Sequence, residues 1–318
     1  MPEMPEVETI RRTVAARAAG RRVEAVEVRR PKFVEPLTPE EFTERVAGRR
    51  ITEVDRRGKY LILRLTEDTR NAPAGEVVIH LKMAGRLLVC RAGEVLEPKL
   101  EKHTHVVFRL EGGEELRHID LRHFGRVSWV PGARDRAGYA AHPKLKGLAE
   151  LGPEPLSPDF TYDYLRSGLA RRKTKVKPLL LDQSFVAGLG NIYADEGLYR
   201  ARIHPGRRAA DLKPAEVRAL FKAIQEIIRE AIAHRGTTIA TYVDGEGKRG
   251  EFAAMLLAYG RTGEKCDRCG TPIERIVLGG RSTHFCPKCQ KLPRPKKPAA
   301  PRKKLARTTV RGKQEVVQ

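Results

Sequence analysis

The chain has 318 residues, with 62 Lys or Arg against 40 Asp or Glu, so its formal net charge is +22 at pH 7. Hydrophobic residues make up 40 %, enough for real cores, which excludes a globally disordered chain. Neither a run of 18 apolar residues nor a secretory signal pattern occurs, so we expect no membrane span and no secretion. About two domains and a polyanionic partner, most often nucleic acid, are predicted; generic basicity is the alternative.

The first part of the chain predicts a β-rich domain over 1–132. Apolar residues at helical spacing predict a helix over 6–19, with Pro5 before it and Gly20 at its end. The sequence Glu111-Gly112-Gly113-Glu114 predicts a hairpin turn. Short strands separated by turn signals are typical of a β-sandwich or barrel. Runs of β-forming residues lie at 23–28, 60–65, 77–81, 105–110, 115–120 and 126–130.

The second part of the chain changes its periodicity. The Pro-rich stretch LGPEPLSPDF predicts a linker, which we place at 133–159. Beyond it, apolar residues fall on one face of a helix that opens at Pro214 and ends near Gly236. We therefore expect a mostly helical domain over 160–260.

Four of the five cysteines lie in one segment with the spacing C-x2-C-x16-C-x2-C. Two such knuckles can direct four thiolates at one tetrahedral zinc ion, and an all-Cys set leaves no open position, so the zinc would be structural. Disulfides are the weaker alternative because no secretory signal is present. The fifth, Cys90, stands in an apolar run and predicts a buried small side chain. We expect one Zn²⁺ in a finger over 261–291, held by Cys266, Cys269, Cys286 and Cys289.

The last segment, 292–318, holds nine Lys or Arg and one Glu, a net charge of +8, and is rich in Pro and Ala. It has no apolar periodicity and predicts a disordered basic tail. Such a tail could add unspecific phosphate contacts or act only on solubility. The remaining chain stays basic without it.

The chain opens with Met1-Pro2-Glu3. Removal of Met1 would leave Pro2 with a free secondary amine, which is nucleophilic when unprotonated and can form an iminium with a sugar C1′. The neighbouring Glu3 could move protons on the ribose ring oxygen or on the proline nitrogen. Taken alone, this opening fits an ordinary helix start better.

The opening PEMPEVE resembles the PELPEVE signature of the formamidopyrimidine-DNA glycosylase (Fpg, or MutM) family, part of the wider Fpg/Nei family. The motifs RRGKYL, HLKMAG, DLRHFG, GLGNIYADE and GGRSTHFC match the same family in order and spacing. The resemblance covers 2–291 and implies a multidomain α+β fold with an N-terminal β-sandwich and flanking helix, a helix-two-turn-helix domain and a C-terminal zinc-finger β-hairpin. Departures are few: Met4 replaces the usual Leu, and His123 stands where a basic residue is common.

The resemblance implies a catalytic set. Pro2 corresponds to the family's nucleophile and Glu3 to its acid–base group, with Glu6 as a supporting carboxylate. Lys59 corresponds to a hairpin lysine near the lesion, and Arg281 to the finger arginine beside the extruded nucleotide. From the residues alone, Lys59 would be an ordinary surface lysine on a strand and Glu6 a first-turn helix carboxylate.

The resemblance also implies DNA contacts for Lys177, Asn191 and His103. From the residues alone, Lys177 would be a solvated cation at a helix end. Asn191 would be a helix N-cap, which is compatible with phosphate binding at a helix N-terminus.

Base extrusion leaves a hole in the duplex that apolar or planar side chains can fill. Met83, Arg122 and Phe124 match the family's void-filling residues. A lone Met or Phe is more often a core residue, but an Arg in the same set fits a hydrophobic core badly. The set favours the Fpg branch over the endonuclease VIII (Nei) branch, whose sequences begin PEGPE. The Gly-rich loop Asp244–Phe252 matches the family's flexible loop over the flipped base.

The resemblance implies a bifunctional DNA glycosylase/AP lyase of base excision repair, acting on damaged double-stranded DNA. Its substrates would be 8-oxoguanine and formamidopyrimidines, removed through a Schiff base on Pro2 and then β- and δ-elimination. We expect a cytoplasmic, nucleoid-associated monomer with no membrane partner and no nucleotide or redox cofactor. Two alternatives stay open: Nei-like action on oxidised pyrimidines, and a catalytically silent binder of damaged DNA.

Overall fold

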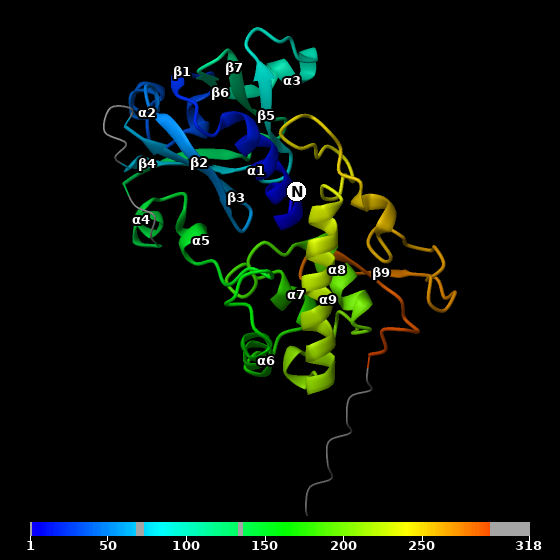
Figure 1. The fold of residues 1–318 in the computed structure, drawn as a ribbon. Helices are drawn as coiled ribbons and strands as arrows, with labels where there is room; N and C mark the ends of the chain where they lie inside the picture. Colours follow the sequence, from blue (N-terminus) through cyan, green and yellow to red (C-terminus); the bar gives the residue numbers. More distant parts are fainter. Residues whose placement is uncertain (1, 68–72, 133–135, 293–318) are drawn as a thin grey trace, which may run out of the picture.

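The computed structural model describes residues 2–67, 73–132 and 136–292. The tail predicted at 292–318 thus lies, apart from Leu292, outside the described residues. Figure 1 shows a β-rich half formed by the first part of the chain and a helical half that carries a β-hairpin on its flank. The N-terminus lies where the two halves meet (Figure 1). Within the described residues, the helices are all too short or too polar to cross a bilayer.

Two four-stranded antiparallel sheets form the β-rich half, as predicted for a sandwich. Their inward-facing residues, among them Val54, Leu63, Val106 and Phe108, share one apolar core. The first sheet has the order β1 (Val23–Val28), β6 (Thr104–Leu110), β7 (Glu114–Asp120), β5 (Gly85–Arg91). The second has the order β2 (Arg50–Arg57), β3 (Tyr60–Thr66), β4 (Pro73–His80), β8 (Arg126–Pro131).

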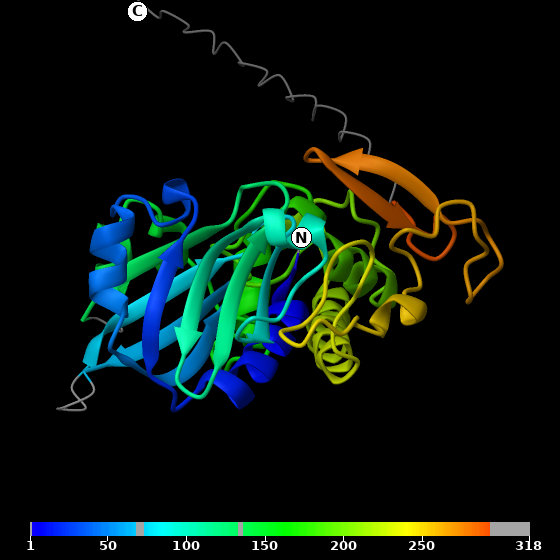
Figure 2. The ribbon, with the colours of Figure 1, turned by 90° about the horizontal axis from the view of Figure 1, so that it is seen from above.

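Helix α1 (Met4–Ala18) is the predicted N-terminal helix and begins two residues earlier than expected. It buries Val7, Ile10 and Val14 in the sandwich core and also contacts the long helix of the other half. Its position therefore carries the N-terminal residues into the junction between the halves, which Figure 2 shows from above. Two further short helices, α2 (Pro39–Val46) and α3 (Pro98–Lys102), flank the strands.

The segment that we predicted as a linker is folded onto the sandwich where the structure describes it. It contains α4 (Arg136–Ala141) and α5 (Lys146–Ala149). Leu148 and Leu151 pack with Ile62 and Val78 in a small separate cluster. This contact holds the chain against the sandwich just before it enters the helical half.

The helical half has its own core, built around α9 (Pro214–Ala233) and α8 (Asn191–Arg200). The predicted helix α9 is amphipathic and buries Leu220, Ile224 and Ile228. The hairpin β9 (Glu274–Leu278) and β10 (Arg281–Phe285) packs β10 against α8. The helices are α6 (Tyr162–Ala170), α7 (Val176–Leu180), α8 (Asn191–Arg200) and α9 (Pro214–Ala233).

Helical structure ends earlier than predicted, because α9 stops at Ala233 and only a short 3-10 turn, Phe252–Met255, follows before 260. Gly236 terminates the helix: its φ is +78°, and its N–H bonds to the carbonyl of Ala231 at 2.7 Å. A left-handed residue of this kind is the usual end of a helix.

The Gly-rich loop expected to be a mobile lid is tied to the sandwich in this structure. The N–H of Gly245 donates to Thr13 Oγ1 at 3.0 Å, and its carbonyl accepts from Val89 N–H at 2.7 Å. Asp244 is buried and accepts from the backbone of Lys248. In this structure the Gly245 end of the loop thus lies against the sandwich, and its mobility stays a prediction.

Candidate active site

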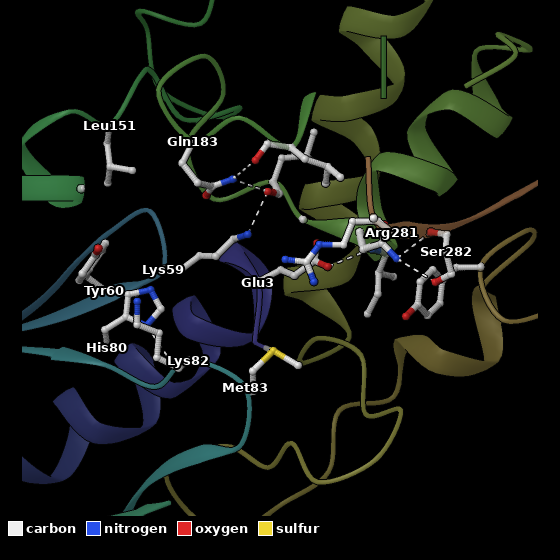
Figure 3. A pocket seen from close by; sticks show the side chains of 18 of the residues that line it. Glu3, Lys59, Tyr60, His80, Lys82, Met83, Leu151, Gln183, Arg281 and Ser282 are labelled. Carbon is white, nitrogen blue, oxygen red and sulfur yellow. Dashed lines mark hydrogen bonds between the residues drawn. The ribbon is translucent and has the colours of Figure 1, made fainter. Parts of the chain in front are cut away.

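A cavity of about 640 Å³ lies between the two halves and the hairpin. Its lining includes Glu3, Lys59 and Met83 from the N-terminal half and Asn191 and Arg281 from the C-terminal half. Figure 3 shows Lys59, Glu3 and Arg281 converging on it. The structure therefore brings together residues that lie up to 278 positions apart in the sequence.

Glu3 joins the halves because its carboxylate sits at the N-terminus of α8. Oε1 accepts from the N–H of Ile192 at 2.9 Å, and Oε2 from that of Tyr193 at 3.5 Å. Gly190 makes this approach possible, since a Cβ there would lie 2.3 Å from Glu3 Cδ. Free N–H groups at a helix N-terminus favour a carboxylate.

Burial nevertheless has the largest effect on the pKa of Glu3. The side chain is almost fully buried, and this raises the pKa to about 7, against an ordinary value of 4.5. The Lys59 ammonium and the helix N–H groups oppose the rise, while the nearby Glu6 carboxylate adds to it. A carboxyl group with a pKa near 7 can both accept and donate a proton at neutral pH.

Glu6 holds the N-terminal segment from within α1. Oε2 accepts from the N–H of Glu3 at 2.7 Å, and Oε1 accepts from Thr237 N–H at 2.7 Å and from the Tyr193 hydroxyl at 2.5 Å. Burial raises the pKa of Glu6 as well. One carboxyl thus connects α1, α8 and the segment after α9.

Pro2 is buried beside this network. It lines a second cavity of about 170 Å³ together with Glu6, Thr237 and Tyr242. Met83, Ile192 and Tyr259 line both cavities. Pro2 and Glu3 therefore face two adjoining spaces that share a wall.

Lys59 lies directly after Gly58, whose φ of +57° makes the tight turn between β2 and β3. Its ammonium donates to the carbonyl of Leu189 at 3.0 Å. Burial lowers the pKa of Lys59, Glu3 counteracts this, and the positive charge of Arg281 adds to it. Lys59 is thus a buried cation beside a carboxyl group, not the surface lysine that its strand context alone would favour.

Asn191 and Arg281 meet at the hairpin side of the cavity. Gly190 is the N-cap of α8, so Asn191 is the first helical residue rather than the cap. Its Nδ2 donates to the carbonyl of Ser282 at 3.0 Å, whereas its buried Oδ1 has no hydrogen-bond partner among the described residues. Arg281 begins β10 and has an exposed side chain.

Lys177 departs from the expected DNA contact. Its side chain is fully buried, and its ammonium is 2.6 Å from Asp195 Oδ1, 2.7 Å from the carbonyl of Ser282 and 2.9 Å from Thr283 Oγ1. A buried ammonium requires such partners because desolvation is costly. In this structure Lys177 joins α7, α8 and β10 from the inside and presents no surface to a phosphate.

The three candidate void-filling residues lie on two loops at the sandwich end. Met83 and Phe124 are 39 % and 50 % exposed, which excludes a core role for either. The guanidinium of Arg122 stacks over the Phe124 ring at 5.1 Å. His103 is partly exposed near the same loop, with Nδ1 3.1 Å from His123 Nε2. All of these side chains are therefore at least partly accessible to solvent.

Comparisons with known proteins agree with this geometry. Family models match in the same order as the structure: the Formamidopyrimidine-DNA glycosylase N-terminal domain at 1–127, its H2TH domain at 151–243, and the zinc finger found in FPG and IleRS at 263–292. Formamidopyrimidine-DNA glycosylases of Heliobacterium modesticaldum and Herpetosiphon aurantiacus are 50 % and 49 % identical over 291 residues, which is 92 % and 91 % of this chain and all of each relative. The chain belongs to the formamidopyrimidine-DNA glycosylase family.

Solved structures from the same family have the same fold. A Lactococcus lactis FPG mutant in complex with DNA containing Fapy-dG has a TM-score of 0.81 and 36 % identity. The wild-type Lactococcus lactis Fpg in complex with DNA containing an oxidized pyrimidine has a TM-score of 0.79 and 34 % identity. Each covers 92 % of this chain and 100 % of the other. The predicted α+β architecture is thereby confirmed.

The zinc finger of this Fpg-family chain has the donor set that was predicted. The four cysteine sulphurs lie within 4.8 Å of one another, and Cys269 Sγ is 3.5 Å from Cys286 Sγ. Four thiolates at such separations fit tetrahedral zinc, and the absence of a disulfide among them agrees. The site is structural: Cys266, Cys269, Cys286 and Cys289 hold the ends of the hairpin that carries Arg281.

Several residues of the Fpg site were not found from the sequence. Gln183 positions the loop before α8, donating to the Leu189 carbonyl that also binds Lys59 and accepting from Gly188 N–H. His80 lines the cavity, and burial lowers its pKa to about 3, so the imidazole is neutral there. Glu154 accepts from the N–H of Gly58 at 2.5 Å and therefore holds the Lys59 turn. Only the Pro-rich context of Glu154 was visible in the sequence, and it indicated a linker.

Proposed function

We propose that this chain is a bifunctional DNA glycosylase/AP lyase that excises oxidised purines from duplex DNA. The observation that carries the proposal is the Glu3 carboxyl, which is buried next to Pro2 and has a pKa of about 7 at the junction of the two halves. Membership of the formamidopyrimidine-DNA glycosylase family supports glycosylase activity. The names of the relatives and the damaged DNA in the solved complexes support damaged DNA as the partner.

In the proposed first step, the Pro2 nitrogen attacks C1′ of the damaged nucleotide. A bond forms between nitrogen and C1′ as the glycosidic bond breaks, and the base leaves with the electron pair and takes up the proton that the Pro2 nitrogen loses. Protonated Glu3 donates its proton to the ring oxygen O4′, which opens the sugar and leaves an iminium between Pro2 and C1′. The raised pKa of Glu3 gives it that proton near pH 7.

The iminium then acts as an electron sink. The Glu3 carboxylate takes a proton from C2′ as the C3′–O3′ bond breaks in β-elimination, and loss of the C4′ proton to water then breaks the C5′–O5′ bond in δ-elimination. Water finally releases the sugar remnant from Pro2. We propose that Lys59, held near Glu3, and Arg281, at the hairpin, bind the phosphates that leave, since both cations line the cavity.

The remaining predicted residues are proposed to hold the DNA. Asn191, at the start of α8, is suited to a phosphate contact through its side-chain NH2 group and the helix N-terminus. Met83, Arg122 and Phe124 would fill the space left by the extruded base. His103 would contact the backbone beside them. For Lys177 we propose a positioning role, because its ammonium is fully used inside the protein.

Borohydride trapping tests the chemistry. The wild-type chain, with Met1 shown by mass spectrometry to be removed, is incubated with an 8-oxoguanine duplex and sodium borohydride. A covalent protein–DNA adduct is expected, and Pro2→Gly should abolish it while retaining DNA binding. Absence of the adduct from a correctly processed wild type would leave a silent binder of damaged DNA.

A parallel assay tests the substrate class. Single-turnover excision is compared on 8-oxoguanine and thymine glycol duplexes of the same sequence. We expect faster excision of 8-oxoguanine. The Lactococcus lactis neighbour with an oxidized pyrimidine makes the comparison necessary, and a strong preference for thymine glycol would replace the proposed substrate class with a Nei-like one.

A further inference from the structure

Three histidines from separate elements form a cluster beside the candidate void-filling loop. His103 is the C-cap of α3, His105 is the second residue of β6, and His123 lies in the turn between β7 and β8. One ring nitrogen from each residue lies within 4.8 Å of those from the other two. The His105 and His123 ring centres are 4.8 Å apart, and those of His103 and His123 are 5.3 Å apart. Such convergence of imidazoles is the donor geometry of a transition-metal site.

The hydrogen bonds leave a lone pair on one nitrogen of His105 and on at least one nitrogen of the other two histidines. His105 Nε2 lies 2.9 Å from the backbone carbonyl of Asp120 and donates to it, so Nδ1 carries the lone pair. Metal-binding histidines characteristically fix their second nitrogen in this way. His103 Nδ1 and His123 Nε2 face each other at 3.1 Å, so at least one of these two nitrogens is an acceptor. Phe33 stacks on the His105 ring at 4.3 Å and fixes its plane.

The surroundings of His105 and His123 favour the neutral imidazole, the form that binds metals. Burial is the main cause that lowers the pKa of His105 and of His123, and Arg30 lowers both further. Lys32 also acts on His123, while the Asp120 carboxylate opposes both shifts. Arg30 contacts His123 Nδ1, but its side chain is exposed and can turn into solvent when an ion binds.

We propose that His103, His105 and His123 form a second metal site, which binds one borderline divalent cation such as Zn²⁺ through three imidazole nitrogens. Water would complete the coordination, as is usual for sites with three protein ligands. The site is distinct from the cysteine finger and shares no residue with it. It depends on His123, which stands where a basic residue is common in the family, and an arginine there could not act as a ligand.

Zinc uptake by the full chain tests the proposal. The protein is purified with the finger loaded, loosely held metal is removed with a weak chelator, and ZnCl₂ is titrated calorimetrically with elemental analysis of the product. The wild type is expected to take up one zinc beyond the chelator-resistant one. His123→Arg and His103→Gln should each weaken this uptake at least about tenfold, because each removes a ligand.

His142→Gln is the matched control, since His142 is a partly exposed histidine of the α4–α5 segment outside the cluster. It should bind the additional zinc like the wild type. Circular dichroism and retention of the finger zinc establish that each variant is folded. His103 and His123 are both partly exposed, so neither substitution removes a core side chain. A wild type that takes up no additional zinc, or either cluster variant binding it with wild-type affinity, overturns the site.

Discussion

Glu3 Oε1 accepts a 2.9 Å hydrogen bond from the backbone N–H of Ile192, 189 residues further along the chain. The N-terminus of the sandwich half thereby caps the first turn of α8 in the helical half. Two effects compete at this carboxyl group: the helix N-terminus favours the carboxylate, and burial favours the neutral acid. Burial wins, because the pKa rises to about 7.

This balance predicts how Glu3→Gln changes stability with pH. The folded chain holds the Glu3 proton up to about pH 7, whereas the unfolded chain releases it near 4.5. Burial of Glu3 therefore costs no stability below pH 4.5, costs more as the pH rises from 4.5 to 7, and costs a constant amount above 7. Glu3→Gln should therefore be more stable than the wild type at pH 8 by up to about 3 kcal/mol, and nearly equal at pH 4.5. Urea unfolding at both pH values measures the difference. A difference that does not change with pH would contradict the raised pKa.

The strands that the sequence predicted, such as Tyr60–Thr66 and Thr104–Leu110, are apolar on at least one face. Strand β5 (Gly85–Arg91) is apolar too but was not among the predicted strands. Strand β2 escaped prediction because five of its eight residues are charged, and only the structure shows their partners, for example Arg64 beside Asp55. Helix α2 had a readable signal, the capping box of Thr38 and Glu41.

The candidate site likewise contains some residues that the sequence identified and others whose environment it did not predict. Pro2, Glu3 and Arg281 were found through motifs, because their identity is tied to sequence patterns. The burial of Lys177 was not predictable, since it depends on Asp195 and Thr283, which meet it only in the folded chain. A lysine in a short polar segment gives no sign of such long-range partners.

Glu154→Gln should loosen the turn that carries Lys59. Glu154 binds Arg56 Nη2 at 2.8 Å and Gly58 N–H at 2.5 Å, and both charged side chains are about nine-tenths buried. Loss of the charge should cost roughly 3 kcal/mol of stability, the lower end for a buried pair, because Arg56 keeps Glu8. It should also lower the rate of excision under saturating enzyme, since Lys59 loses its fixed position.

Glu150→Gln provides the control for this experiment within the same segment. Its ion pair with Lys146 is 3.9 Å long and largely exposed, so its loss should change stability by no more than about 0.5 kcal/mol. Thermal melting and single-turnover excision measure both variants. Equal effects of the two substitutions would show that Glu154 does not hold the turn.

Removal of zinc should act on DNA binding through the hairpin. Cys269→Ser deletes one of four thiolates, and β10 then loses its anchor, together with the Ser282 carbonyl that Asn191 and Lys177 contact. We expect at least about tenfold weaker binding to an abasic-site duplex, or about 1.4 kcal/mol, measured by fluorescence anisotropy. Cys90→Ala, outside the cluster, should leave zinc content and affinity unchanged. Undiminished binding by a zinc-free Cys269→Ser chain would exclude this role of the hairpin.

Phe124→Ala separates a function in DNA distortion from a function in folding. Phe124 is 50 % exposed and contacts Arg122, so its truncation should change the free energy of unfolding by no more than about 0.5 kcal/mol. Unstacking a base step costs a few kcal/mol, and without the ring to fill the gap excision should slow at least about tenfold. Phe33→Ala is the converse case, because Phe33 is fully buried and its loss should cost about 3–5 kcal/mol of stability. Chemical denaturation and single-turnover excision on the same preparations distinguish the two variants. If Phe124→Ala lowered the free energy of unfolding as much as Phe33→Ala, the Phe124 ring would belong to the core instead.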